Sequence, residues 1–344
     1  MRNLILIATV LFLNSCAQEI KSEENTKQPN QSDYFVYGDS VESAGVRMIP
    51  IQTPSGKFKV WTKRFGNNPK IKILLLHGGP AMTHEYMECF ETFFLRESFE
   101  FYEYDQLGSY YSDQPKDSSL WTTERFVEEV EQVRKSIGAD SSNFYLLGNS
   151  WGGILAMEYA LKYQQNMKGL LVANMMASAT EYGKYADEVL SKQMDPEVLK
   201  EITAIEAQGD YANPRFMELL IPHYYKHHIC RLEEWPDGLN RSFKHANGEI
   251  YVLMQGPSEF GISGRLQNWD IKDRLSEIEV PTLMIGAKYD TMDPKAMEEQ
   301  SELVQNGSYL YCPNGSHLAM WDDQQVFMQG VISFVKKVNG QKLE

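Results

Sequence analysis

Five residues near the middle of the chain, from Gly148 to Gly152, constrain the fold more than any other part of the sequence. They are Gly-Asn-Ser-Trp-Gly and match the pattern G-x-S-x-G, with Ser150 at the centre. The apolar run 144–147 precedes this pattern and small residues follow it, which predicts a buried strand, a sharp turn and a helix from Gly152. Such a turn holds its serine above the sheet, at the positive end of the helix dipole. We therefore predict that Ser150 is a nucleophile.

The rest of the chain alternates between short apolar runs and stretches with helical spacing, which favours a largely parallel sheet. Strands are predicted over residues 57–65, 71–76, 144–147, 169–172, 282–285 and 308–311, and helices over 123–137, 152–163, 294–304 and 324–338. Between residues 178 and 264 the strand signal fades, and Asp195-Pro196 and Asn213-Pro214 each begin a helix. The sequence thus predicts an α/β-hydrolase fold, mostly a parallel sheet flanked by helices. Residues 34–177 and 265–344 form its core, and residues 178–264 an inserted helical cap.

The N-terminal segment differs from the rest of the chain. Arg2 precedes the apolar run 4–13, which is too short to span a bilayer and is typical of a signal peptide. Because the run ends at Leu-Asn-Ser-Cys, we predict a signal peptide over residues 1–15 and lipidation of Cys16, as in bacterial lipoproteins. Residues 16–33 predict a flexible tether. We expect an exported protein, anchored to the membrane of the cell envelope and facing the periplasm or the exterior. Plain secretion with cleavage nearby is the alternative.

Charge and cysteine content exclude several classes of protein. The 344 residues carry a formal net charge of −14 without any run of five basic residues, which argues against a nucleic-acid partner. Cys89, Cys230 and Cys312 lack C-x-x-C spacing, which predicts buried free thiols and neither a zinc site nor a disulfide framework. One bridge between two of them, formed in an oxidising envelope, is the alternative. His223 and His227 share a helical face, but no third ligand has suitable spacing. We expect no metal and no other cofactor.

Two backbone amides are candidates for an oxyanion hole. The amide of Trp151 directly follows the nucleophile. The second donor is expected from the loop after an earlier strand, and His77-Gly78-Gly79-Pro80 follows the predicted strand 71–76. Gly79 is our choice, because glycine permits a close approach of the backbone. We expect His77 to have a structural role.

The remaining catalytic groups should follow in the order serine, acid, histidine. Asp290 and Asp293 both lie after the predicted strand 282–285. Asp293 directly precedes a proline and suits a helix cap, so we choose Asp290 as the acid that orients the base. His317 is the one histidine that follows Asp290, and we predict that it is the base.

Besides the proposed catalytic residues, the chain from about Tyr34 onward contains a set of short motifs that point to one family. They are His77-Gly78-Gly79-Pro80, Asp105-Gln106, Gly148-Asn149-Ser150-Trp151-Gly152-Gly153, His227-His228-Ile229-Cys230-Arg231, Trp269-Asp270, Tyr289-Asp290 and Gly315-Ser316-His317. Together they resemble the proline iminopeptidases, in particular the relatives that act with the tricorn protease. The resemblance implies the same nucleophile, acid and base that we chose from the residues.

The resemblance also implies how the substrate is held. The family binds the free N-terminal amine with carboxylates of the cap, and the matching positions here are Glu233 and Glu259. An amine that enters an apolar pocket needs such a partner, because its desolvation would otherwise prevent binding. Glu234 could take the place of Glu233, and most glutamates of a protein are simply solvated or salt-bridged.

The implied activity is the release of N-terminal proline, or of a small apolar residue, from peptides through an acyl-enzyme on Ser150. The chain departs from the family at Ala81 and Tyr110, where the family has glycine, and at Leu107, where it has arginine. These departures leave the pocket shape and the preferred substrate open. A carboxylesterase or amidase with the same triad is an alternative, as is a lipoprotein that binds peptides without turnover. An intact Ser, Asp and His argues against the binder.

Overall fold

The computed structural model describes residues 45–211 and 213–341, which pack as one compact unit. The predicted signal peptide, the tether, Cys16 and residues 34–44 lie outside the described residues. No helix in the described part of the chain is long and apolar enough to cross a membrane.

Eight strands form one sheet in the order β1-β2-β4-β3-β5-β6-β7-β8. The first two pairings, β1 with β2 and β2 with β4, are antiparallel, and the remaining pairings are parallel. The strands are β1 (Val46–Thr53), β2 (Gly56–Phe65), β3 (Lys72–Leu76), β4 (Glu100–Tyr104), β5 (Phe144–Asn149), β6 (Gly169–Ala173), β7 (Thr282–Ala287) and β8 (Gly307–Cys312). This mostly parallel sheet confirms the predicted α/β-hydrolase fold.

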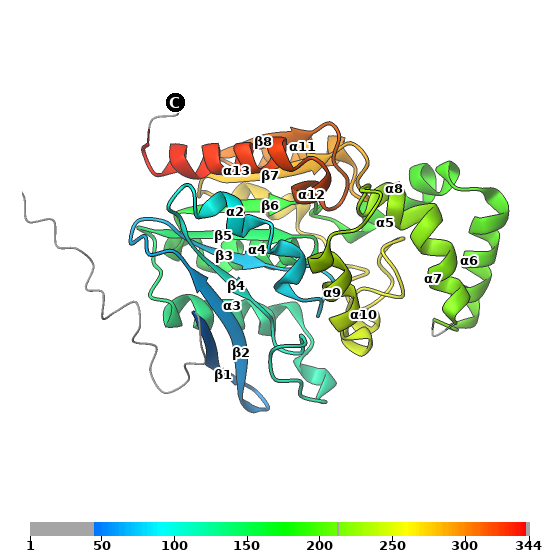
Figure 1. The fold of residues 1–344 in the computed structure, drawn as a ribbon, viewed down its shortest axis with the longest axis horizontal. Coiled ribbons are helices and arrows are strands. Elements are labelled where there is room, and N and C mark those ends of the chain that lie inside the picture. Colours follow the sequence, from blue (N-terminus) through cyan, green and yellow to red (C-terminus); the bar gives the residue numbers. More distant parts are fainter. Residues whose placement is uncertain (1–44, 212, 342–344) are drawn as a thin grey trace, which may run out of the picture. The chain divides into compact units, whose positions relative to one another are not determined.

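Helices cover both faces of the sheet (Figure 1). Alternate residues of β3 enter two separate hydrophobic cores, Leu74 and Leu76 in one and Ile73 and Leu75 in the other. The helices of the core are α2 (Phe90–Phe94), α3 (Thr123–Ser136), α4 (Trp151–Tyr163), α11 (Pro294–Leu303), α12 (Ala319–Asp322) and α13 (Gln324–Val338). Side chains of α3, α4 and α11 fill the first core, and side chains of α2 and α13 fill the second. Burial on both faces explains why the central parallel strands β3, β5, β6 and β7 are mainly apolar runs.

Between β6 and β7 the described chain forms helices and loops, as predicted for the cap. They are α5 (Ala179–Tyr185), α6 (Pro196–Gln208), α7 (Pro214–Leu220), α8 (Lys226–His228), α9 (Asp237–His245) and α10 (Gly248–Met254), with π-helical turns over Ala186–Leu190 and Ile221–Tyr225. Asp195 and Asn213 cap α6 and α7, and a proline follows each cap, as the sequence predicted. Figure 1 shows α6 and α7 extending away from the sheet, whereas α9 and α10 lie close to it. The division at residues 178 and 264 stays a prediction.

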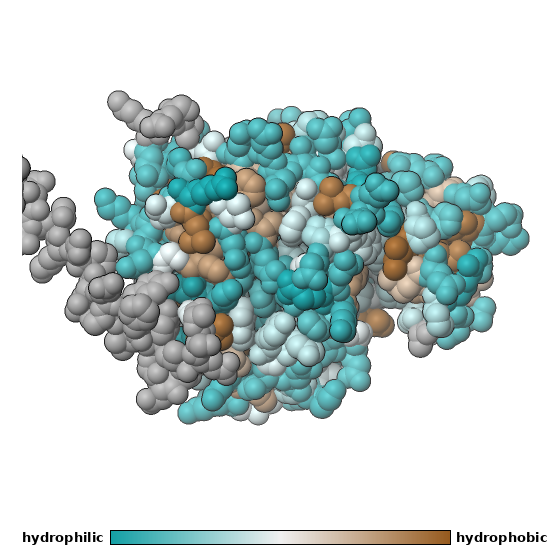
Figure 2. Space-filling view, viewed as in Figure 1, coloured by the Kyte–Doolittle hydropathy of each residue, from teal (hydrophilic) through white to brown (hydrophobic). Residues whose placement is uncertain are grey.

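The face of the molecule in Figure 2 is mostly hydrophilic, and its hydrophobic residues lie in small separate groups. The three predicted free thiols, Cys89, Cys230 and Cys312, are indeed unpaired and buried.

Candidate active site

The turn around Ser150 has the strained geometry that the sequence predicts. Ser150 lies between β5 and α4 with φ 57° and ψ −127°, a conformation that is costly for a residue with a side chain. The flanking glycines make the turn possible. A Cβ on Gly148 would lie 1.9 Å from the carbonyl oxygen of Gly152, and a Cβ on Gly152 would lie 2.0 Å from that of Leu76. The close packing of strand and helix therefore requires glycine at both positions.

Asp290 and His317 meet beside this turn. Asp290 follows β7, His317 follows β8, and the Nδ1–H of His317 donates to Oδ1 of Asp290 at 2.7 Å. Burial alone would lower the pKa of the imidazole, but the carboxylate of Asp290 outweighs it and raises the pKa of His317 above its ordinary value. Nε2 of His317 is buried without a hydrogen-bond partner among the described residues. This nitrogen is therefore free to accept a proton.

Two further side chains hold the acid. Nδ2 of Asn174 donates to Oδ2 of Asp290 at 2.6 Å, and the hydroxyl of Thr291 donates to Oδ1 of Asp290 at 3.4 Å. Asp290 is fully buried. Asp293 accepts a hydrogen bond from the amide of Lys295 and caps α11, as predicted for the competing aspartate.

The two candidate oxyanion donors lie at the same end of the sheet. Trp151 is the first residue of α4, and Gly79 lies in the loop after β3. The neighbouring amide of Gly78 is already engaged, because it donates to the hydroxyl of Tyr86 at 2.6 Å. Within the part of the chain that the structure describes, the amide of Gly79 has no acceptor. The amide of Gly79, unlike that of Gly78, is thus available to a ligand.

The side chain of His77 stabilises the oxyanion loop through hydrogen bonds, in keeping with the structural role expected from the sequence. Its Nδ1–H donates to the carbonyl oxygen of Gly78 at 3.0 Å, and its Nε2 accepts from the amide of Gln106 at 3.2 Å. The Gln106 side chain in turn accepts from the indole of Trp151 at 2.7 Å. Burial lowers the pKa of His77 and favours its neutral form. These contacts tie the loop to the beginning of α4.

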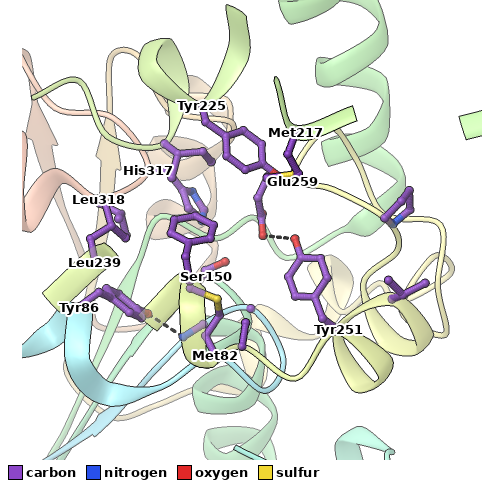
Figure 3. A pocket seen from close by; sticks show the side chains of 18 of the residues that line it. Met82, Tyr86, Ser150, Met217, Tyr225, Leu239, Tyr251, Glu259, His317 and Leu318 are labelled. Atoms are coloured by element: carbon purple, nitrogen blue, oxygen red, sulfur yellow. Dashed lines mark hydrogen bonds between the residues drawn. The ribbon is translucent and has the colours of Figure 1, made fainter. Parts of the chain in front are cut away.

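A cavity of about 220 Å³ opens above Ser150. Figure 3 shows Ser150, His317 and Glu259 around this cavity. Its walls are mainly apolar and come from the cap as well as the core. Apolar and aromatic lining residues include Met82, Phe216, Met217, Tyr225, Ile229, Leu239, Phe243, Val252 and Leu318. Among the described lining residues, Glu259 is the single one with a carboxylate.

Four tyrosines surround Glu259. The hydroxyl of Tyr251 donates to its Oε1, and the dashed line in Figure 3 marks this bond. The hydroxyls of Tyr182 and Tyr224 donate to the carbonyl oxygen of Glu259 at 2.6 and 3.3 Å, and Tyr225 accepts from its amide at 3.2 Å. Burial and the nearby carboxylate raise the pKa of Tyr251, which keeps its hydroxyl protonated. The carboxylate is therefore fixed in place at the cavity wall.

The structure does not bring Glu233 to the cavity. Glu233 and Glu234 are both exposed, and neither lines the cavity. Nζ of Lys226 donates to the carbonyl oxygen of Glu233 at 3.0 Å, and among the described residues the Glu233 carboxylate has no partner. Of the two predicted cap carboxylates, the structure thus brings Glu259 to the cavity and leaves Glu233 outside its lining, and the substrate-binding roles stay predictions. The loop that carries Glu233 and Glu234 precedes α9.

The three departures from the family lie outside the cavity lining. Ala81 has φ 61°, a left-handed conformation that suits the family's glycine, so the backbone path is retained despite the methyl group. Leu107 is buried in the first core. Tyr110 is half exposed and stacks on His245 with ring centroids 4.0 Å apart.

Tyr86, Asn149 and Asn174 are site residues that the sequence analysis missed. Asn149 accepts from the hydroxyl of Tyr86 at 2.9 Å and donates to the carbonyl oxygen of His317 at 3.3 Å. Asn149 stands inside the G-x-S-x-G pattern, which was the available signal, whereas Tyr86 and Asn174 stand in no motif. In the described residues, no group of three or more His, Cys, Asp and Glu side chains is arranged to hold a metal ion.

Comparison with known proteins gives a family. Residues 72–324 match the family model for the alpha/beta hydrolase fold. The chain is 80% identical to a proline iminopeptidase of Flavobacterium johnsoniae over 296 residues, which are 86% of this chain and 100% of the relative. A proline iminopeptidase of Chitinophaga pinensis is 54% identical over 294 residues, 85% of this chain and 98% of the relative. The solved proline iminopeptidase of Mycobacterium smegmatis matches with a TM-score of 0.74 at 26% identity, over 84% of this chain and 98% of that one.

Proposed function

The chain belongs to the proline iminopeptidase family of α/β hydrolases, and we propose that it releases N-terminal proline or a small apolar residue from peptides through an acyl-enzyme on Ser150. Its class, a serine aminopeptidase, follows from this membership. The finer parts of the proposal are the role of each residue and the preferred N-terminal residue. One observation supports them most: a carboxylate held by tyrosines, Glu259, lines the same apolar cavity as Ser150 and His317.

The proposed reaction begins when Nε2 of His317 takes the hydroxyl proton of Ser150. Oγ of Ser150 attacks the carbonyl carbon of the N-terminal residue, and the amides of Gly79 and Trp151 stabilise the oxyanion. His317 then gives the proton to the leaving nitrogen, so the shortened peptide departs and an ester on Ser150 remains. Water, deprotonated by His317, hydrolyses this ester and releases the amino acid. Asp290 holds the imidazole in the required tautomer and stabilises its charged form.

Glu259 would select for a free N-terminus. The substrate's ammonium group loses its hydration when it enters the apolar cavity, and a charge-assisted hydrogen bond to Glu259 compensates for that loss. Since the carboxylate is fixed by Tyr251, its position relative to Ser150 sets the length between amine and scissile carbonyl. This length would decide how many residues fit between the two groups, and an aminopeptidase requires room for one.

The test compares three substrates: a proline arylamide with a free amine, the same compound with a blocked amine, and a simple aryl ester. We expect cleavage of the free-amine compound, little cleavage of the blocked one, and loss of activity in Ser150→Ala. Equal cleavage of the blocked compound would contradict the role of Glu259. Turnover of the ester alone would identify a carboxylesterase, and binding without turnover would identify a peptide-binding protein.

Matched variants separate the two cap glutamates. We expect Glu259→Gln to raise KM for the free-amine substrate by roughly 10- to 100-fold, because a charged hydrogen bond contributes about 1.5–3 kcal/mol. Glu233→Gln should leave KM and kcat unchanged, since this side chain is exposed and outside the cavity. An equal effect of both changes would show that the loss is not specific to the cavity.

We also propose that the protein is exported and anchored to the cell envelope through a lipid on Cys16. The support is the sequence alone: the apolar run 4–13 and the Cys after it. Mass spectrometry of the mature N-terminal peptide should find a diacylglycerol group on Cys16 and none in Cys16→Ser. A mature N-terminus at another residue would refute the anchor and indicate plain secretion.

A further inference from the structure

One short segment of the cap contacts both the substrate-binding wall and the catalytic pair. It comprises residues 224–229, the end of the π-helical turn Ile221–Tyr225 followed by α8 and Ile229. At its beginning, the hydroxyl groups of Tyr224 and Tyr225 bind the backbone of Glu259. Its last two residues bind the loops that carry the proposed acid and base. The segment therefore joins two parts of the site that are otherwise far apart in the sequence.

His228 makes the contact to both loops. The Nδ1–H of its imidazole donates to the carbonyl oxygen of Tyr289 at 2.9 Å, and Tyr289 directly precedes Asp290. Its own carbonyl oxygen accepts from the backbone amide of His317 at 2.9 Å. The side chain is 6% exposed, and burial lowers its pKa, so the ring stays neutral with its proton on Nδ1.

The next residue, Ile229, makes further hydrogen bonds to the base-bearing loop. The carbonyl oxygen of Ile229 accepts from the amide of Leu318 at 2.9 Å and from the hydroxyl of Ser316 at 2.9 Å. The base-bearing loop is thus hydrogen-bonded to the cap on both sides of His317. The segment binds the acid-bearing loop through the imidazole of His228. The two loops also share one direct backbone hydrogen bond, from the amide of Tyr289 to the carbonyl oxygen of Gly315 at 3.0 Å.

We propose that His228 is a positioning residue that keeps the acid-bearing and base-bearing loops at the spacing required for the bond between Asp290 and His317. Because His228 belongs to the segment 224–229, it also connects the cavity wall that carries Glu259 to these two loops. The second statement rests on the proposed function, whereas the first requires only the triad. His228 does not contact the reacting atoms and takes no proton from them.

A purely structural histidine and a positioning histidine make different predictions. Loss of a structural contact lowers stability but leaves the folded enzyme unchanged. Loss of the positioning contact lengthens the bond between Asp290 and His317, and that bond is what raises the pKa of His317. Other carboxylates that raise it, Glu259 and Asp322, stay in place. The kinetic pKa on the acid side of the pH profile should therefore fall in the positioning case and stay constant in the structural case.

The experiment uses three substitutions at this position in the full chain. His228→Asn places an amide N–H near the position of Nδ1 and keeps the donor, whereas His228→Leu removes it. His228→Gln keeps a polar side chain but moves the donor away. It replaces the leucine variant as the test of the lost contact if the leucine variant does not fold. The readouts are kcat and KM for the proline arylamide, turnover of an aryl ester, and the labelling rate of Ser150 by a fluorophosphonate probe, each corrected for the folded fraction.

We expect kcat and the labelling rate to fall by up to about 100-fold in the leucine and glutamine variants, with the acid limb shifted to lower pH and KM changed much less. The asparagine variant should recover most of the rate and the normal acid limb. Equal rates per folded molecule in all variants would overturn the proposal. Because labelling and ester turnover require no free amine, they test His228 even if the arylamide is not a substrate and the proposed function fails.

Discussion

The hydroxyl group of Tyr86 lies 2.6 Å from the amide nitrogen of Gly78 and accepts its hydrogen bond. Figure 3 shows Tyr86 among the residues that line the cavity. The same hydroxyl donates to Asn149, which in turn donates to the carbonyl oxygen of His317. One buried phenol thus connects the oxyanion loop, the nucleophile turn and the base-bearing loop. It also engages the Gly78 amide, so the amide of Gly79 is left for an oxyanion.

Removal of this hydroxyl should reduce the rate without weakening substrate binding. In Tyr86→Phe, the amide of Gly78 loses its acceptor, and the loop with Gly79 is no longer fixed before the reaction. We expect kcat to fall roughly 10- to 100-fold, less than the complete loss of one oxyanion donor, with KM nearly unchanged. Steady-state kinetics on the proline arylamide measure both constants.

Tyr309→Phe is the matched control. Its hydroxyl also makes a partly buried hydrogen bond, donating to the carbonyl oxygen of Pro294 at 2.8 Å, but it lies outside the cavity. Stability should fall by about 1 kcal/mol, and kcat should not change. If Tyr86→Phe lost only stability as well, the phenol would have no part in the reaction.

The pH dependence of activity should follow the proton on His317. The base must be neutral to accept the proton of Ser150, and Asp290 raises its pKa above the ordinary imidazole value. We therefore expect kcat/KM to rise with pH through a value above 6.5. Asp290→Asn should lower kcat by about 10⁴-fold and move the acid limb to lower pH. An acid limb unchanged by this substitution would show that another group controls it.

A buried carboxyl group of the core should make stability depend on pH. Burial raises the pKa of Glu103 to about 8, with His84 acting in the opposite direction, and Oε1 of Glu103 has no partner among the described residues. The folded state therefore binds more protons than the unfolded chain between the ordinary value of 4.5 and about 8. The stability from this group is complete below 4.5 and is lost as the pH rises through 8.

Glu103→Gln removes that titration and keeps the shape of the side chain. At pH 9 we expect the variant to melt above the wild type, by at least about 2 °C, because the wild type must ionise a buried carboxyl group. At pH 5 the two melting temperatures should nearly coincide. A difference that is the same at both pH values would contradict a raised pKa for Glu103.

Most of the sheet could be predicted from the sequence, because a strand buried on both faces is a continuous apolar run. The sequence analysis missed strands β1 and β4, and for β4 the reason can be identified. In β4, Glu100 and Glu103 are both about 1% exposed, so charged residues stand where the pattern suggests solvent. Glu100 is paired with Arg64 at 3.0 Å, and such a partner, 36 residues away, is invisible in a local pattern.

The catalytic motifs could be predicted because local backbone geometry demands particular residues near the nucleophile. The substrate-binding residues could not be predicted in the same way. The sequence favoured Glu259 over Glu233, since the adjacent Glu234 could take the place of Glu233, but only tertiary structure shows which of them lines the cavity. The hydroxyl of Tyr182 that binds the backbone of Glu259 lies 77 residues away in the chain. Contacts of this kind follow from how the cap folds over the core.

An ionic cluster should keep the cap helix α9 against the oxyanion loop. Arg241 on α9 binds Glu85 at 2.6 Å and Glu88 at 3.0 Å, and both glutamates belong to the loop after Met82. His245, also on α9, binds the second oxygen of Glu85 at 2.8 Å. Burial alone would raise the pKa of Glu85, but these hydrogen bonds outweigh it and lower the pKa. The carboxylate is thus ionised and holds the helix.

Arg241→Met should therefore loosen one wall of the cavity, since α9 carries the lining residues Leu239 and Phe243. We expect a stability loss of about 1–2 kcal/mol and a several-fold rise in KM, with kcat affected less. Lys116→Met is the control, because its ion pair with Glu249 is about 80% exposed on both sides and should contribute little. Thermal unfolding of both variants measures the stability loss, and steady-state kinetics measure KM and kcat. If Arg241→Met lost stability while KM stayed constant, α9 would keep its place without the cluster, and the cavity wall would depend on apolar packing alone.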